Sequence, residues 1–221
     1  MTVIVPVGPG DAVAPALCAQ LETLPAATEL CVVCVDGDDV ARAAAACGAR
    51  WQRCTAPRGR AAQQNAGAAG TTRPWLWFVH ADSRLSERTL PALAAFLAVD
   101  VPALGFFDLR FHDGPTLLTI NTIGAWIRSR ALGMPFGDQG LVLPRASFDA
   151  LGGFDPTLER GEDHDIVWRA RHRGLPLRPI GAPLYTSGRR YAEHGWWRTT
   201  TWTVRETWRQ ARRFARPAAT R

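Results

Sequence analysis

The sequence predicts an α/β fold in which a mostly parallel, Rossmann-like sheet carries helices on both faces. Short apolar runs of strand length alternate with longer helical stretches along the first half of the chain. These runs lack alternation of polar and apolar residues, as expected of strands that are buried on both faces. With 221 residues and 47% hydrophobic content, the chain can enclose a full core.

The first half of the chain contains four predicted strands and three predicted helices. Asp11 is suited to cap the first helix, and Gly48 and Gly70 are suited to end the second and the third. We expect strands at residues 3–7, 30–35, 49–54 and 75–79, and helices at residues 11–24, 38–47 and 58–70.

After Asp82 the alternation becomes less regular. Ser86 is a good N-cap for a helix with Pro91 in its first turns, and Gly174 is suited to end a later helix. We expect helices at residues 86–99, 117–132, 162–173 and 191–214, and strands at residues 104–111 and 140–143. These elements suggest one domain at residues 1–188, with a basic amphipathic helix and tail at 189–221 packed on it.

Composition favours a cytoplasmic protein. The N-terminus lacks the basic residues and apolar run of a secretory signal, and no run of about 18 apolar residues predicts a membrane span. The number of cysteines, five, is odd, which argues against a disulfide framework. A strand would also point Cys31 and Cys34 to opposite faces. We interpret the cysteines as small buried residues of a reducing compartment.

Positive charge is concentrated at the C-terminus. All 26 basic residues are arginines, and nine of them lie in residues 189–221 against Glu193 and Glu206, which gives that segment a net charge of +7. The first 188 residues hold 17 arginines against 18 acids, a net charge of −1. Proteins that bind nucleic acids usually spread a basic groove over the fold, so this distribution disfavours that class.

Polar residues that follow the predicted strands are candidates for a ligand site, because ligands of such sheets bind beyond the carboxyl ends of the strands. Asp82 is placed to bind a hard cation that bridges phosphate oxygens, although aspartate is also a common turn former at such a position. Arg60, Gln64 and Gly67 share a helix face, and arginine with a side-chain amide suits a nucleotide.

A second acidic cluster, Glu162 and Asp163, opens the predicted helix at 162–173. Acids at this position compensate the helix dipole. Alternatively, a carboxylate near an acceptor hydroxyl can take its proton as a general base while a metal stabilises a departing diphosphate.

Five motifs, in matching order and spacing over nearly the whole chain, resemble those of the family 2 glycosyltransferases, in a subgroup of short soluble members. The motifs are Gly59-Arg60-Ala61-Ala62-Gln63-Gln64-Asn65-Ala66-Gly67-Ala68, Phe78-Val79-His80-Ala81-Asp82, Phe136-Gly137-Asp138-Gln139-Gly140, Gly152-Gly153-Phe154 followed by Glu162-Asp163, and Ser187-Gly188-Arg189-Arg190.

The resemblance implies a GT-A type fold and an inverting transfer of a hexose-like sugar from a nucleoside-diphosphate sugar, assisted by a divalent metal, manganese or magnesium. It implies that Asp163 is the catalytic base, with Glu162 holding acceptor or sugar. Metal contacts are implied for Asp82 and His194, donor contacts for Pro6, Val7, Asp36, Arg60, Gln64, Asn65, His80, Ala81, Arg189 and Arg190, and acceptor-side contacts for Asp138 and Gln139.

Two positions depart from the family pattern. Many members have two aspartates where this chain has His80 and Asp82, and the first loop, residues 7–10, lacks the usual polar pair. These departures motivate an alternative, a nucleotide-sugar-binding protein without catalysis, whereas retention of Glu162 and Asp163 favours the enzyme. Donor base, sugar, acceptor and oligomeric state are not encoded in any recognisable motif.

The predicted last helix has two faces. Its arginine face comprises Arg198, Arg205, Arg209, Arg212 and Arg216, and its other face comprises Trp197, Val204, Trp208, Ala211 and Ala215. In one interpretation the tryptophan face packs on the domain and the arginines are solvated. In the other, the arginines and Trp202 rest on an anionic membrane and bring the enzyme to a lipid-linked acceptor.

Overall fold

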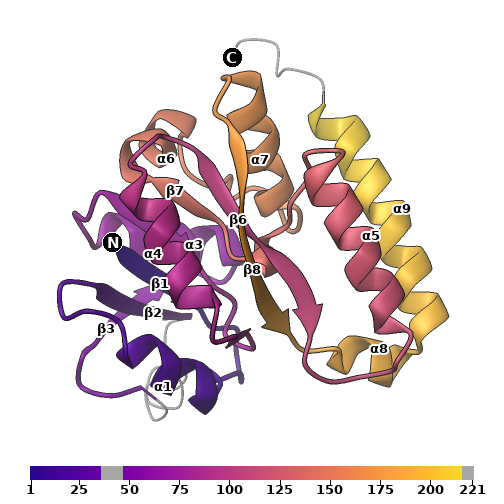
Figure 1. Ribbon diagram of the computed structural model, residues 1–221, viewed down its shortest axis with the longest axis horizontal. Coiled ribbons are helices and arrows are strands. Elements are labelled where there is room, and N and C mark those ends of the chain that lie inside the picture. Colours follow the sequence, from indigo (N-terminus) through magenta and orange to yellow (C-terminus); the bar gives the residue numbers. More distant parts are fainter. Residues whose placement is uncertain (36–46, 216–221) are drawn as a thin grey trace.

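The computed structural model describes residues 1–35 and 47–215 and shows one mixed β-sheet with helices packed on both faces (Figure 1). The sheet has eight strands in the order β3-β2-β1-β4-β7-β6-β8-β5. The expected α/β architecture is therefore confirmed, but the sheet is mixed because β7 and β5 run antiparallel to their neighbours.

The first half of the chain forms four neighbouring parallel strands of the sheet. Its strands are β1 (Thr2–Pro6), β2 (Glu29–Val35), β3 (Trp51–Ala56) and β4 (Trp75–Phe78). Its helices are α1 (Pro15–Glu22) and α3 (Arg60–Ala69). Most of the helix expected at 38–47 lies outside the described residues.

Helix α1 begins four residues later than expected. Pro15 occupies the start of the helix, where its missing N–H costs nothing, and Ala14 is the N-cap. Asp11 does not cap the helix, because it lies in a turn four residues before Pro15, where its backbone N–H donates to the carbonyl of Gly8 at 3.1 Å.

The second half of the chain completes the sheet with β5 (Arg84–Leu85), β6 (Leu104–Phe111), β7 (Val142–Pro144) and β8 (Leu177–Thr186). The sequence analysis missed β8, the longest strand. Pro179 and Pro183 interrupt its apolar pattern, and proline is unusual inside a sheet. A register shift against β6 lies between these prolines, and the Pro183 carbonyl accepts a hydrogen bond from Thr89 Oγ1 at 2.8 Å.

Two hydrophobic cores lie on opposite faces of the sheet. On one face, α1 and α4 (Thr89–Ala98) pack through Leu17, Leu21 and Leu93. On the other, α3, α6 (Arg145–Leu151) and α7 (Glu162–His172) pack against Ile4 and Phe78. Between β6 and β7 lie helix α5 (Leu118–Arg130) and the 3-10 helix η1 (Gly137–Gln139).

The expected last helix is broken in two. Gly195 adopts φ +82° and ψ 142°, a conformation open to glycine, and separates α8 (Arg189–His194) from α9 (Trp196–Phe214). No helix among the described residues is long and apolar enough to cross a membrane.

The interpretation in which the tryptophan face of α9 packs on the domain is wrong for its large side chains. Of that face only Ala211 is buried, together with Thr199 and Thr207, while Trp197 and Trp208 are 73% and 50% exposed. Threonine and alanine allow a close approach to the domain, and the bulkier side chains are left on the outside.

All five cysteines are free thiols, as expected of buried cysteines without a disulfide framework. Burial raises the pKa of Cys31 and of Cys47, so both remain protonated at neutral pH. They act as small apolar side chains in the cores.

Gly67 brings α3 close to the sheet. A Cβ atom at this position would lie 2.6 Å from Ile4 Cγ2 and 3.0 Å from Val33 Cγ2, both on central strands. We expect Gly67→Ala to lower the free energy of unfolding by about 1–3 kcal/mol through overpacking. Gly124→Ala in α5 is the matched control, because its Cβ would meet no atom within 4 Å, and it should stabilise by about 0.5–1 kcal/mol. Urea titration of both variants checks the difference, and equal effects would contradict it.

Candidate functional site

Acidic and basic side chains gather beyond the carboxyl end of β4. The loop that follows this strand carries His80 and Asp82, and the starts of α3 and α7 contribute Arg60 and Glu162–Asp163. The helix η1 closes the group from the side of β7. The sheet thus brings together residues that are up to 103 positions apart in the sequence.

Asp163 is the most firmly held carboxylate of the group. Its Oδ2 accepts a hydrogen bond from the backbone N–H of Gly137 at 2.6 Å, and its Oδ1 accepts one from the backbone N–H of His164 at 2.8 Å. Burial alone would raise the pKa of Asp163, but the Arg60 guanidinium and these N–H groups outweigh it and lower the pKa. Asp163 is therefore ionised at neutral pH while part of its surface stays accessible.

Glu162 forms an ion pair with Arg60. The distance from Arg60 Nη1 to Glu162 Oε1 is 3.1 Å, and the Glu162 side chain is 4% exposed whereas that of Arg60 is 50% exposed. Burial and the charge of Asp163 raise the pKa of Glu162, and Arg60 acts in the opposite direction. Arg60 thus stabilises the negative charge of both carboxylates, and half of its side chain remains accessible to a ligand.

Helix η1 contributes a third carboxyl group, Asp138. Burial raises its pKa to about 6, with Asp163 adding to the shift and Arg128 opposing it. The Oδ1 atom of Asp138 is buried and has no hydrogen-bond partner among the described residues. Asp138 is therefore available to a ligand that offers a donor.

The sequence analysis missed Arg128, which projects from α5 toward the site. Its Nη2 donates to Gln139 Oε1 at 3.1 Å, and its guanidinium carbon lies 3.3 Å from the centre of the Phe136 ring. Burial lowers its pKa to about 10, which still leaves it charged at neutral pH. One arginine among 26 carries no local signal for this role, because only the fold brings α5 beside η1.

Both polar atoms of the Gln139 side chain are engaged within the protein. Its side chain is fully buried, donates to the Phe107 carbonyl at 2.8 Å and accepts from the backbone N–H of Phe136 at 3.2 Å as well as from Arg128. Gln139 therefore holds η1 and Arg128 in place.

His80 and Asp82 differ in their surroundings. His80 Nε2 is buried without a hydrogen-bond partner among the described residues, and burial together with Arg60 lowers the pKa of His80 to about 3, so the ring is neutral. Asp82 is exposed as a residue, yet partial withdrawal of its carboxylate from water raises its pKa, with His112 and Arg189 partly offsetting the shift. The two residues therefore offer a neutral imidazole beside Arg60 and Asp163 and a carboxylate beside His112 and Arg189.

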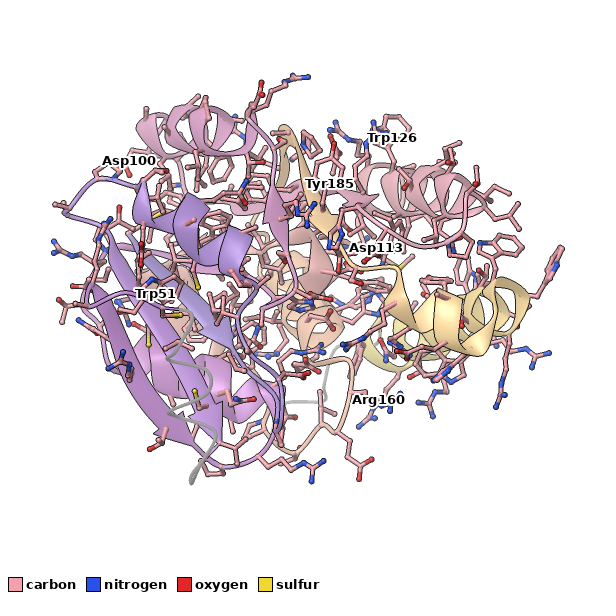
Figure 2. The ribbon with its side chains drawn as sticks, turned by 90° about the horizontal axis from the view of Figure 1, so that it is seen from below. Trp51, Asp100, Asp113, Trp126, Arg160 and Tyr185 are labelled. Carbon is pink, nitrogen blue, oxygen red and sulfur yellow. The ribbon has the colours of Figure 1, made fainter. Side chains whose placement is uncertain are left out.

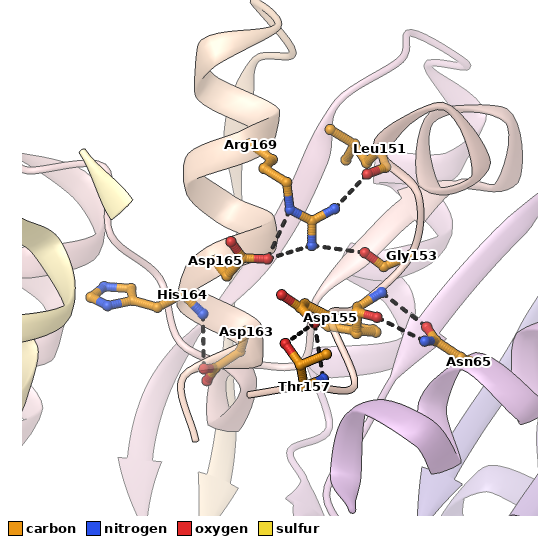
Figure 3. Close-up of polar contacts among 10 residues, drawn as sticks. Asn65, Leu151, Gly153, Asp155, Thr157, Asp163, His164, Asp165 and Arg169 are labelled. Carbon is orange, nitrogen blue, oxygen red and sulfur yellow. Dashed lines mark hydrogen bonds and ion pairs between the residues drawn. The ribbon is translucent and has the colours of Figure 1, made fainter. Parts of the chain in front are cut away.

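One predicted donor contact, Asn65, makes structural hydrogen bonds. Both polar atoms of the Asn65 side chain bond to the backbone of Phe154, Nδ2 to the carbonyl at 2.8 Å and Oδ1 to the N–H at 2.9 Å (Figure 3). Asn65 is therefore engaged with Phe154 and not with a ligand, which sequence spacing alone could not reveal. Gln64 is 2% exposed, and its Oε1 has no hydrogen-bond partner among the described residues.

Gln63, which was not among the predicted site residues, holds the carboxyl ends of β1 and β2 together. Gln63 Nε2 donates to the carbonyls of Val7 at 2.6 Å and Val33 at 2.9 Å. Pro6 and Val7 are buried at the end of β1 and the start of the following loop, and the carbonyl of Ala81 accepts from the N–H of Ala14 at 2.8 Å. Asp36 lies outside the described residues.

Figure 3 shows how the start of α7 is anchored. Arg169 Nε donates to Asp165 Oδ2 at 2.8 Å, and the same guanidinium bonds to the carbonyls of Leu151 and Gly153. Asp165 is thereby directed to Arg169, whereas Asp163 on the same turn is directed to Gly137.

Helix α8 places three predicted residues at the rim. Arg189 and Arg190 are exposed at its start, and His194 is exposed at its end. The loop before it is held by Asp113, whose Oδ2 accepts from Ser187 Oγ at 2.9 Å (Figure 2 labels Asp113). Arg189 acts electrostatically on Asp82, but His194 has no such interaction with it.

We expect Asp138 to make stability depend on pH. Its folded pKa is about 6 against 3.8 for the unfolded chain, so its stabilising contribution is complete below pH 3.8 and is lost as the pH rises through 6. The free energy of unfolding of Asp138→Asn relative to wild type should therefore increase by up to about 3 kcal/mol between pH 4 and pH 8. Urea titrations across this range test the trend, and a difference that is constant with pH would contradict it.

Comparisons with known proteins identify the fold. No protein-family model and no curated protein match the chain. Among solved structures, S. aureus TarS superposes with a TM-score of 0.62 at 16% identity, over 84% of this chain and 36% of that one. TarS 1-349 in complex with UDP-GlcNAc gives 0.59 at 14% identity, over 84% and 58% of the two chains.

A mannosyltransferase from Pyrobaculum calidifontis, in complex with GDP-Man and Mn2+, gives a TM-score of 0.60 at 20% identity, over 82% of this chain and 55% of that one. The chain thus spans between about a third and three fifths of the length of these structures. At these identities the likeness establishes the fold, and the protein has the GT-A type fold of these glycosyltransferases.

Proposed function

We propose that this protein is an inverting glycosyltransferase that moves a sugar from a nucleoside-diphosphate sugar to a hydroxyl acceptor, with Asp163 as the general base. One observation carries the proposal: Asp163 is an ionised carboxylate, held by two backbone N–H groups and bordered by Arg60 at the carboxyl edge of the sheet. Structures with this fold that contain UDP-GlcNAc or GDP-Man support a nucleotide sugar as donor.

The proposed reaction uses the carboxylate in a single displacement. The acceptor hydroxyl oxygen forms a bond to the anomeric carbon, its proton passes to Asp163, and the bond from that carbon to the diphosphate breaks with its electron pair leaving on the diphosphate. Attack from the side opposite the leaving group inverts the anomeric configuration. Because both Asp163 oxygens are held by N–H groups, the carboxylate has one fixed orientation before substrate arrives.

Positive charge for the donor diphosphate is available at the open edge of the site. Arg60 keeps half of its side chain exposed, and Arg189 and Arg190 are exposed at the start of α8. We assign these three arginines to the diphosphate and the end of β1, Pro6–Val7, to the nucleotide. Glu162 retains a role beside Asp163, since its ion pair keeps Arg60 in place.

The described residues do not form a preformed metal site. No group of three or more histidine, cysteine, aspartate or glutamate side chains among them could hold an ion. Asp82 offers one carboxylate and His80 a neutral nitrogen, so a manganese or magnesium ion would need oxygen ligands from the donor diphosphate.

The base assignment is tested by Asp163→Asn. With a sugar nucleotide that wild type turns over, we expect kcat to fall by about 10²–10⁴-fold, because the proton acceptor is lost, while donor affinity stays within a few-fold of wild type. Glu159→Gln, an exposed acid just before α7, is the matched control and should retain full activity. Release of nucleoside diphosphate measures turnover.

Two results would overturn this assignment. If Asp163→Asn keeps more than a third of the wild-type rate, another group is the base. If wild type binds a sugar nucleotide in a thermal-shift screen but turns over none of those it binds, the protein is a nucleotide-sugar-binding protein.

The metal proposal is tested by thermal shift with UDP and GDP, each with and without manganese. We expect manganese to increase the nucleotide-induced rise in Tm of wild type and to have no such effect on Asp82→Asn, because that variant loses the carboxylate ligand. The same measurement on His194→Ala tests whether the exposed histidine contributes to manganese binding. An equal manganese effect in wild type and Asp82→Asn would exclude Asp82 as the ligand.

A further inference from the structure

Helices α5 and α9 expose an unusual amount of apolar surface. On α5, Ile120, Ile123, Trp126 and Ile127 are between 47% and 54% exposed, and on α9 Trp197, Val204 and Trp208 are between 50% and 73% exposed. We call these seven residues the α5–α9 face. Large apolar side chains that gather on a surface mark an interaction site more often than isolated ones do.

The two helices lie side by side (Figure 1). Asn121 of α5 donates to Thr200 Oγ1 of α9 at 3.1 Å and accepts from Trp196 Nε1 at 2.6 Å. Both helices bury the opposite side, through Ala125 and Ser129 on α5 and through Thr207 on α9.

Helical spacing fixes where the apolar residues of α9 stand. Residues 197, 204 and 208 are seven and four positions apart, which places Trp197, Val204 and Trp208 in one stripe along the helix. On the surface of α9 this stripe lies next to Thr200, which contacts α5. On α5, Ile120, Ile123 and Ile127 repeat at three and four positions and form a parallel stripe on its outer side. Figure 2 shows Trp126 on that outer side.

A row of arginines borders the apolar stripe of α9. Arg198, Arg205 and Arg212 repeat every seven residues and are exposed. Within residues 1–35 and 47–215, none of these three arginines forms an ion pair with a carboxylate. The border therefore carries uncompensated positive charge.

Charge complementarity decides what this face binds. A second copy of the chain would bring two arginine rows together, and an apolar protein partner would leave them without counter-charges. An anionic lipid surface offers an apolar layer beneath a sheet of negative head groups, which matches an apolar stripe bordered by arginine. Tryptophan suits that boundary because its ring is large and apolar and its N–H remains able to bond to water or head groups.

We propose that the α5–α9 face docks on an anionic membrane surface, with Trp197, Val204, Trp208 and the α5 isoleucines in the lipid and Arg198, Arg205 and Arg212 at the head groups. This proposal does not rest on glycosyl transfer, because binding to lipid is measured without a sugar nucleotide. Of the two interpretations of this helix that the sequence left open, the proposal follows the one with an anionic membrane, but with Trp197, Val204, Trp208 and the α5 isoleucines in place of Trp202 as the apolar contacts.

Sedimentation with vesicles tests the proposal. We expect the full chain to sediment at low salt with vesicles of phosphatidylcholine and phosphatidylglycerol but not with vesicles of phosphatidylcholine alone. Salt of about 1 M, where the Debye length is about 3 Å, should weaken the binding strongly.

Two sets of variants with matched controls locate the contact. The triple variant Arg198→Gln, Arg205→Gln, Arg212→Gln should weaken partitioning by about a hundredfold, while Arg53→Gln, Arg88→Gln, Arg178→Gln removes the same charge elsewhere and should weaken it far less. The double variant Trp197→Ser, Trp208→Ser should weaken it by about tenfold or more, and Val99→Ser, Val101→Ser, which changes exposed apolar residues outside the face, should leave it unchanged. All ten side chains in these variants are exposed, and circular dichroism confirms folding of each variant.

Three outcomes would overturn the proposal. The first is a failure of the wild-type chain to sediment with anionic vesicles at low salt. The second is an equal loss in the triple arginine variant and its charge-matched control. The third is that wild type forms a dimer in light scattering and does not bind vesicles, while the tryptophan variant is a monomer. The face would then join two copies of the chain.

Discussion

The pair of hydrogen bonds between the Asn65 side chain and the backbone of Phe154 joins the two halves of the molecule. Asn65 lies on α3, whose first residue is Arg60, and Phe154 lies in the segment that leads to α7 and Asp163. An amide that donates and accepts at once fixes both distance and orientation. The ion pair between Arg60 and Glu162 forms across the same junction, so the charged site depends on the alignment of α3 with α7.

That alignment also explains why three carboxyl groups coexist in one site. Asp163 is stabilised as an anion by two N–H groups and Arg60, whereas burial raises the pKa of Glu162 and Asp138. Arg128 supplies a second positive charge from α5. A group of acids with different proton affinities is a common arrangement where protons are transferred, because one member stays ionised while another can carry a proton.

The sequence predicted what depends on strand ends and helix starts. Residues after buried strands meet at one edge of a parallel sheet, which is why Asp82, Arg60 and Glu162–Asp163 were expected together and lie in the same region. It did not predict side-chain direction. Asn65 stands in the same motif as Arg60, yet only its hydrogen bonds with Phe154 decide that its side chain joins two elements of the fold. Strand β8 was missed because its prolines contradict strand propensity, and the sheet tolerates them through a register shift.

Gly195 links two helices that belong to different surfaces of the molecule. Gly195 is the single residue that connects the helix carrying Arg189 and Arg190 to the helix carrying the outward tryptophans. A change of angle at this residue moves one helix relative to the other. If such a change accompanies binding on either helix, the two events share a coupling free energy, and each must alter the affinity of the other by the same factor. One backbone conformation, available to glycine alone, would then set how strongly the outer surface and the interior of the site influence each other.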